Sequence, residues 1–148
     1  MLLLLRVGML VKEIMSKNVI TIRQDETILH ACDIYKKYKV GCLIVTDADK
    51  KHVGIITERD IIERTICDQK DPATTPVSAI MTSNPKTVHS LDNLDKALEI
   101  MKTYDIKKLP VLYNGVIAGI ITVTDISRAR PELSKRFMDT WVKPSWKD

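Results

Sequence analysis

The sequence predicts an α+β fold made of two related β-α-β-β-α units, and three observations support this prediction. The segment GIITERDI at residues 54–61 returns as GIITVTDI at residues 119–126, with six of eight positions identical. Earlier in the chain, VKEIMSKNVITI at residues 11–22 matches VSAIMTSNPKTV at residues 77–88 with an offset of 66 residues. The offset falls to 65 between these blocks, in a turn, where insertions and deletions are tolerated.

Each unit opens with a strand and continues with a helix. In the first unit the strand is VITI at residues 19–22, and the helix follows in ETILHACDIYKKY at residues 26–38. Apolar or aromatic residues recur there at helical spacing, as they do at the matching place in the second unit. These residues are Ile28, Ala31, Cys32, Tyr35 and Tyr38, followed by Leu94, Ala97, Leu98 and Met101.

Two apolar runs joined by a turn come next in each unit and predict a pair of neighbouring strands. The first unit has CLIVT at residues 42–46 and VGIIT at residues 53–57. The second unit has LPVLY at residues 109–113 and VIAGIIT at residues 116–122, with Asn114-Gly115 between them. Because Asn-Gly is a strong hairpin signal, we expect a tight turn there.

A second helix is expected to begin at Glu58 in the first unit and at Val123 in the second. Half a core per copy is too little for independent stability, so we expect the two units to pack on each other. The predicted organisation is an N-terminal extension at residues 1–9, a first unit at 10–70, a connector at 71–76, a second unit at 77–129 and a tail at 130–148.

Composition and charge describe an ordinary globular chain of 148 residues with a net charge of +4. Residues 128–148 carry a net charge of +3, which is weak evidence for an acidic partner. The cysteines, at positions 32, 42 and 67, are odd in number and form no CxxC pair, so we expect reduced thiols and a cytoplasmic location. The apolar start at residues 1–5 is too short for a signal peptide or a membrane span, and Met9 is an alternative start.

The repeated Thr-x-x-Asp at residues 57–60 and 122–125 permits two interpretations. Thr followed three residues later by an acid resembles a capping box, and the motif alone favours capping. The same atoms suit a nucleoside, because an Asp carboxylate can accept two hydrogen bonds from a ribose diol and a helix N-terminus attracts anions. Gly54 and Gly119, in the preceding strands, would permit a close approach of backbone.

The ordered, duplicated set of motifs resembles the CBS domain. Each repeat has Ile-Met near its start and Gly-Ile-Ile-Thr-x-x-Asp-Ile near its end, and the resemblance covers residues 10–129. A tandem pair implies two repeats packed about a pseudo-two-fold axis, with clefts between the two sheets. Such pairs bind AMP, ADP, ATP or S-adenosylmethionine and usually form dimers.

The resemblance implies two adenosyl sites, each drawing on both repeats. One would use Ser16, Thr21, Val40, Gly41, Cys42, Thr122 and Asp125. The other would use Thr57, Asp60, Thr82, Thr87, Ile106, Lys107 and Lys108. We expect the Asp125 site to bind adenine better and Lys107 or Lys108 to neutralise phosphate. The alternative is that both lysines are solvated ends of a strand.

No catalytic or metal-binding constellation is evident. The three histidines, His30, His52 and His89, lack the spacing of zinc ligands, and no Walker or dinucleotide-binding loop occurs. The repeats also resemble the CBS insert of inosine monophosphate dehydrogenase, but a catalytic barrel needs about 250 residues. We therefore expect no enzyme activity, no required cofactor and no metal.

The leading hypothesis is a homodimeric adenine-nucleotide sensor that signals to an effector protein. A second possibility is a ligand-free structural or dimerisation module, in which both Thr-x-x-Asp motifs only cap helices. A third is a nucleic-acid accessory protein using the tail, but Trp141 and Trp146 lie among few basic residues. The tail is expected to form a helix from Pro131, with Phe137 and Trp141 on one face.

Overall fold

The computed structural model describes residues 8–133 and residue 135, and the chain divides into two compact units. Unit 2 is the continuous stretch Val19–Pro85, whereas unit 1 combines Met1–Asn18 with Lys86–Asp148. Each unit has its own sheet, helices and apolar core, which confirms the predicted α+β class with two repeats.

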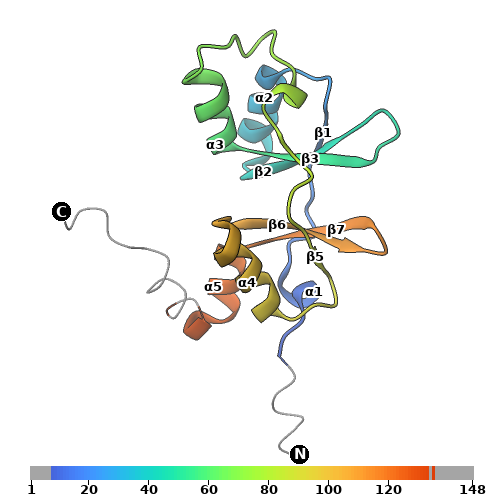
Figure 1. The fold of residues 1–148 in the computed structure, drawn as a ribbon, viewed down its shortest axis with the longest axis vertical. Coiled ribbons are helices and arrows are strands. Elements are labelled where there is room, and N and C mark those ends of the chain that lie inside the picture. The colour runs from blue at the N-terminus through green and yellow to red at the C-terminus, as the bar shows by residue number, and fades with distance from the viewer. Residues whose placement is uncertain (1–7, 134, 136–148) are drawn as a thin grey trace, which may run out of the picture. The chain divides into compact units, whose positions relative to one another are not determined.

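Unit 2 is a four-stranded sheet with helices on one side, as the upper part of Figure 1 shows. The strand order is β1-β2-β3-β4, with β1 parallel to β2 and the other neighbours antiparallel. Its elements are β1 (Thr21–Arg23), α2 (Ile28–Tyr38), β2 (Cys42–Thr46), β3 (His52–Thr57), α3 (Glu58–Ile61), a π-helix (Ile62–Ile66), a 3₁₀ turn (Val77–Ala79) and β4 (Thr82–Ser83).

Unit 1 repeats this plan with a three-stranded sheet in the order β5-β6-β7. Strand β5 is parallel to β6, and β6 is antiparallel to β7. Its elements are α1 (Val11–Ile14), β5 (Val88–His89), α4 (Leu94–Tyr104), β6 (Lys108–Tyr113), β7 (Val116–Thr122) and α5 (Val123–Ala129). The 3₁₀ turn Val77–Ala79 and strand β4 lie just ahead of β5 in sequence but belong to unit 2.

The segment that begins each sequence repeat packs with the core formed by the rest of the other repeat. We call residues 11–18 and 77–85 the first and second entry segments. In unit 1, the amides of Val11 and Lys12 donate to the carbonyls of Asp92 and Ser90 at 2.8 and 2.9 Å. In unit 2, the amide of Val77 donates to the carbonyl of Glu26 at 2.8 Å. The entry segments are therefore exchanged between the repeats.

The two cores correspond position by position. Eight buried residues of unit 2 have an equivalent in unit 1, and both sets are given in matching order. The core of unit 2 contains Ile22, Ile28, Ala31, Leu43, Val45, Ile56, Ile61 and Val77. The core of unit 1 contains Val88, Leu94, Ala97, Leu109, Val111, Ile121, Ile126 and Val11. Most of these side chains are apolar and branched, and burial of one such side chain stabilises by about 1.5–3 kcal/mol. Val11 and Val77, both fully buried, anchor the exchanged entry segments.

The turn and cap residues adopt backbone conformations that their residue types favour. Asn114 and Gly115 adopt positive φ angles of 49° and 78°, as a two-residue hairpin of type I′ requires, so the predicted turn is confirmed. Both long helices end at a left-handed residue, Lys39 or Asp105, and begin at a polar N-cap. The first strand begins at Thr21 instead of Val19, and Ile20 contacts β2 through its carbonyl, which accepts from the amide of Ile44 at 3.0 Å.

Residues 1–7 and most of the tail lie outside the described part of the chain. The predicted N-terminal extension at residues 1–9 is therefore described only at its end. The tail is helical at residues 131–133 and 135, where its predicted helix begins, and the part with Phe137 and Trp141 lies outside the described residues. In the described residues, no helix is both long and apolar enough to cross a membrane.

Candidate functional site

The Thr57-x-x-Asp60 motif forms a polar corner where β3 meets α3 in unit 2. The amide of Asp60 donates to Oγ1 of Thr57 at 3.3 Å, and Oδ2 of Asp60 accepts from the amide of Thr57 at 2.9 Å. The Thr57 hydroxyl also donates to Oδ2 at 3.0 Å. These reciprocal bonds are a capping box, so this prediction is confirmed.

The Thr122-x-x-Asp125 motif forms the matching corner in unit 1, between β7 and α5. The amide of Asp125 donates to Oγ1 of Thr122 at 3.1 Å, and Oδ2 of Asp125 accepts from the amide of Thr122 at 3.0 Å. This corner is also a capping box. We refer to the two sites as the Asp60 corner and the Asp125 corner.

The capping hydrogen bonds leave acceptor positions on both carboxylates, Asp60 and Asp125. A carboxylate has about four lone-pair positions, and the cap uses Oδ2 alone. Both aspartates are half-buried, so neither side chain is fully removed from solvent. The cap therefore orients a carboxylate that can still accept hydrogen bonds from a vicinal diol, and the two interpretations of the motif are compatible.

The glycine of each repeated strand makes room for an entry segment. A Cβ built on Gly119 would lie 2.7 Å from both Sδ of Met15 and the carbonyl oxygen of Ser16. Ser16 pairs there with Ile120, through N–H···O bonds of 2.8 and 2.9 Å. The close approach predicted for this glycine is confirmed, and it brings Ser16 to the strand that ends at Thr122.

Gly54 has the same role in unit 2. Its Cβ would lie 2.8 Å from both Sδ of Met81 and the carbonyl oxygen of Thr82. Thr82 pairs with Ile55 at the start of β4, one strand residue beyond Gly54. The two glycines thus place Ser16 and Thr82, two of the predicted ligand-binding residues, beside the strands that carry the corners.

The predicted site residues divide between the units in a regular way. Unit 1 holds Ser16, Thr87, Ile106, Lys107, Lys108, Thr122 and Asp125. Unit 2 holds Thr21, Val40, Gly41, Cys42, Thr57, Asp60 and Thr82. Ser16 accordingly shares a unit with Asp125, and Thr82 shares one with Asp60. The prediction that each cleft also draws on the other unit stays a prediction.

Strand pairing brings the two predicted lysines to the Asp125 corner. Lys108 is the register partner of Thr122, and the amide of Val123 donates to the carbonyl of Lys107 at 3.0 Å. In unit 2 the equivalent partner of Thr57 is Cys42, which is buried. The backbone at the start of β6 therefore carries two cations next to Thr122, where unit 2 carries small side chains.

Tyr35 supports the Asp60 corner from α2. Its hydroxyl donates to the carbonyl of Ile56 at 2.6 Å, directly before the corner. Burial raises the pKa of this hydroxyl well above its usual value, and nearby Cys42 and Asp60 add to the shift. Met101 stands at the matching position of unit 1 and is fully buried. Tyr35 thus remains neutral and holds β3 by a hydrogen bond that unit 1 does not use.

Arg64 is a contact of the Asp60 corner that the sequence analysis missed. Its Nε lies 3.8 Å from Oδ1 of Asp60, and its Nη1 donates to the carbonyls of Ile80 and Met81 at 3.0 and 3.4 Å. The i,i+4 spacing from Asp60 was a signal that could have identified the ion pair. The hydrogen bonds to the second entry segment had no signal in the local sequence.

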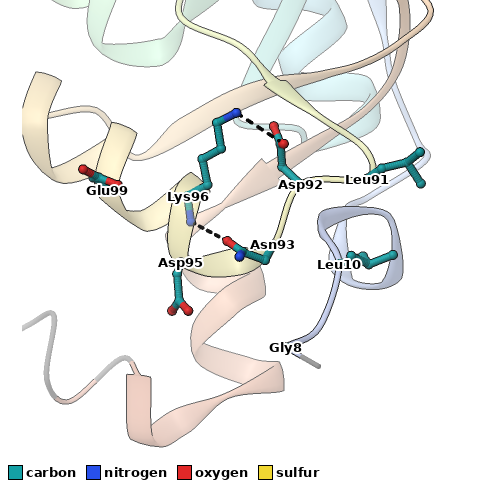
Figure 2. A pocket seen from close by; sticks show the side chains of 8 residues that line it. All are labelled: Gly8, Leu10, Leu91, Asp92, Asn93, Asp95, Lys96 and Glu99. Carbon is teal, nitrogen blue, oxygen red and sulfur yellow. Dashed lines mark hydrogen bonds and ion pairs between the residues drawn. The ribbon is translucent and has the colours of Figure 1, made fainter. Parts of the chain in front are cut away.

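Neither of two hollows in the described residues contains a Thr-x-x-Asp corner. Figure 2 shows the hollow at the start of α4, of about 720 Å³, where Lys96 reaches back to Asp92 at 3.3 Å. A second hollow, of about 510 Å³, lies beside α2 and includes Thr21. The acidic side chains of the first hollow, Asp92, Asp95 and Glu99, form no metal-binding group, and none was found elsewhere in the described residues.

Comparison with known proteins places the sequence pattern in a family. The family model described as CBS domain matches twice, at residues 11–66 and 77–132. An uncharacterized 17.7 kDa protein of Acidianus ambivalens is 33% identical over 120 residues, covering 80% of this chain and 71% of its relative.

Two further similarities bear on function. Inosine-5′-monophosphate dehydrogenase of Aquifex aeolicus is 37% identical over 115 residues, which are 76% of this chain but only 23% of that enzyme. A solved CBS domain pair in complex with 5′-methylthioadenosine and S-adenosyl-L-methionine is 33% identical, with a TM-score of 0.76. That match covers 85% of this chain and 98% of the solved one.

Both matched segments begin at an entry segment and end beyond a Thr-x-x-Asp corner, so they contain the repeated features described above. Together they cover well over half of the chain. This chain therefore belongs to the CBS domain family and carries two copies of the domain in tandem.

Proposed function

We propose that this chain is a regulatory module that binds an adenosyl compound at its Thr-x-x-Asp corners and signals its occupancy to an effector protein. The observation that carries the proposal is the capped, half-buried aspartate of each corner, whose Oδ1 lies outside the cap. Similarity to a CBS pair that binds S-adenosylmethionine and 5′-methylthioadenosine supports an adenosyl ligand. AMP, ADP and ATP present the same ribose diol and belong to the same proposal.

The proposed clefts combine the residue sets implied by the family resemblance. Asp125, Thr122 and Ser16 would meet Thr21 and the adenine-binding residues Val40, Gly41 and Cys42. Asp60, Thr57 and Thr82 would meet Thr87, Ile106, Lys107 and Lys108. The register of β6 with β7 supports a phosphate-neutralising role for Lys107 or Lys108 at the Asp125 corner, because it brings them next to Thr122.

The module is proposed to have no catalytic activity of its own and to act in the cytoplasm. Its likeness to inosine-5′-monophosphate dehydrogenase extends over 23% of that enzyme, so the enzyme's activity does not transfer with it. Two copies are proposed to associate through the helical face of unit 2, where Leu29, Ile62 and Ile66 are exposed. Sedimentation of the wild type and of Ile66→Lys tests this association.

A ligand-free structural module remains the alternative, because the capping boxes by themselves account for Thr and Asp at both corners. On that alternative, replacing either aspartate changes stability equally with and without nucleotide. A nucleic-acid role would instead produce a strongly salt-dependent association with RNA or DNA.

Thermal unfolding with AMP, ADP, ATP, S-adenosylmethionine and GTP tests the proposal. A ligand at one hundred times its dissociation constant stabilises by about 2.7 kcal/mol, or roughly 5–10 °C for a chain of this size. Asp125→Asn and Asp60→Asn retain an oxygen for the cap and remove the charge, so they separate binding from capping. Stabilisation by an adenosyl compound that Asp125→Asn abolishes supports the proposal, and no stabilisation by any of the five contradicts it.

A further inference from the structure

Arg64 links the Asp60 corner to the second entry segment within unit 2. Its guanidinium contacts Oδ1 of Asp60, the carboxylate oxygen outside the cap, at 3.8 Å. The same group donates to the carbonyls of Ile80 and Met81 at 3.0 and 3.4 Å. We call these three contacts the Arg64 bridge. The Arg64 side chain thus connects Asp60, the proposed ribose acceptor, to the backbone directly before Thr82.

A local distortion of the helix accompanies the Arg64 bridge. The α-helix that begins at Glu58 passes into a π-helix at Ile62–Ile66, and Arg64 lies inside it. The next residue, Thr65, is fully buried, and its hydroxyl has no hydrogen-bond partner among the described residues. π-helical turns are rare and are frequently found at functional sites, and an unpaired buried hydroxyl is destabilising. The helical turn that contains Arg64 therefore includes a feature that lowers the stability of the fold, the unpaired hydroxyl of Thr65.

The Asp125 corner has no counterpart to the Arg64 bridge. Four residues after Asp125 the chain has Ala129, and α5 keeps α-helical geometry to that residue. In the part of the chain that the structure describes, Asp125 forms no ion pair, whereas Asp60 has Arg64. The two corners share the same capping box and the same glycine contact but differ in this cation.

We propose that the Arg64 bridge makes the two corners unequal, so that the Asp125 corner is the stronger adenosyl site. Arg64 restrains Oδ1 of Asp60, which a ribose diol would need as its acceptor. A ligand that takes this oxygen competes with Arg64 for the carboxylate, and a movement of Arg64 would reach the second entry segment through Ile80 and Met81. This inference rests on the proposed function, since it ranks two sites for the same class of ligand.

Calorimetric titration with 5′-methylthioadenosine tests the inference, because this compound has the ribose diol and no phosphate that could attract Arg64. The Asp60 and Arg64 side chains are 15% and 48% exposed, so the ion pair is partly screened and should weaken the site by about two- to five-fold. Arg64→Gln retains an amide donor for the carbonyls and removes the charge. We expect it to tighten the weaker site by this factor.

Matched variants assign the change to a corner. The gain from Arg64→Gln should disappear in the double variant with Asp60→Asn, and Asp125→Asn should remove the tighter site of the wild type. Ala129→Arg introduces an arginine at the favourable i,i+4 distance from Asp125 and should weaken the tighter site by about two- to five-fold. We therefore expect Arg64→Gln to tighten binding at the Asp60 corner and Ala129→Arg to weaken binding at the Asp125 corner.

The outcomes distinguish this inference from the proposed function. Equal affinities at the two corners, or an unchanged weaker site in Arg64→Gln, would overturn the inference while leaving adenosyl binding intact. Weaker AMP binding in Arg64→Gln with unchanged 5′-methylthioadenosine binding would also overturn it, because Arg64 would then contact phosphate. If the thermal assay detects no adenosyl ligand and 5′-methylthioadenosine binds no variant, the proposed function and the ranking are both wrong.

Discussion

Gly119 offers a sharp test of how the entry segment is held in unit 1. A Cβ at this position would lie 2.7 Å from the carbonyl oxygen of Ser16, about 0.7 Å closer than an ordinary contact. The methionine sulfur at the same distance can move, because Met15 is flexible. The carbonyl cannot move alone, because it accepts a hydrogen bond from the amide of Ile120 at 2.9 Å.

The cost of Gly119→Ala follows from the bonds that the shift breaks. Ser16 and Ile120 exchange two backbone hydrogen bonds, each contributing about 0.5–1.5 kcal/mol. Losing both lowers the free energy of unfolding by about 1–3 kcal/mol, the range found when a packed site receives an extra carbon. The smaller backbone entropy of unfolded alanine offsets about 0.4–1 kcal/mol of this loss.

Urea unfolding measures the effect, and the chain supplies its own controls. Gly8→Ala should be nearly neutral, because nothing lies within 4 Å of its Cβ position. Gly54→Ala should cost about as much as Gly119→Ala, because its Cβ would meet Met81 and Thr82 at 2.8 Å. If Gly119→Ala were no more destabilising than Gly8→Ala, the close contact with the entry segment would not be a determinant of stability.

Three further predictions concern single side chains. Tyr35→Phe should lower the unfolding free energy by about 1–2 kcal/mol in urea, since it leaves the carbonyl of Ile56 without its 2.6 Å donor. Burial raises the folded-state pKa of Tyr35 above its usual value of about 10, so the contribution of Tyr35 to stability is complete below pH 10 and declines as pH rises further. Tyr35→Phe should therefore reduce the loss of stability measured above pH 10. Leu109→Ala, at a fully buried site, should lower the free energy of unfolding by about 2–5 kcal/mol. Thr122→Ala should lower it by only about 0.5–2 kcal/mol, through loss of the helix cap. Equal losses for these two variants in urea would contradict the assignment of core and cap.

The sequence could predict most elements of the fold because their signals are local. Helical spacing of apolar residues identified α2 and α4, and Asn114-Gly115 identified the turn between β6 and β7. The capping boxes were also legible, because their four residues are contiguous. In these cases the residues that determine the structure are near each other in the chain.

The exchange of entry segments could not be read from periodicity. The residue that anchors each segment is a valine, Val11 or Val77, and the two cores present equivalent apolar side chains to it. A local pattern therefore fits either unit equally well. The family resemblance assigned Ser16 to the Asp125 site and Thr82 to the Asp60 site, and each of these pairs shares a unit in the structure. A cleft that joins the two units stays a prediction.

The Arg64 bridge illustrates a different limit. The segment IERTI gives no sign of π-helical geometry, since its residues suit an ordinary helix as well as a distorted one. Arg64 donates to the carbonyl of Ile80, sixteen residues away in the chain and close before β4, which pairs with β3. Contacts that depend on tertiary structure in this way carry no local sequence signal.

The exchanged entry segments affect how this chain can be divided and how it could have arisen. A fragment cut at the repeat boundaries, such as residues 11–66, would lack Val77 and keep Val11, which belongs to the core of the other unit. By contrast, residues 19–85 are one uninterrupted piece that contains a whole unit. An ancestor with a single repeat would have completed its core with the entry segment of another chain, as swapped dimers do. Duplication would then have joined two such partners into one polypeptide and made an intermolecular exchange intramolecular.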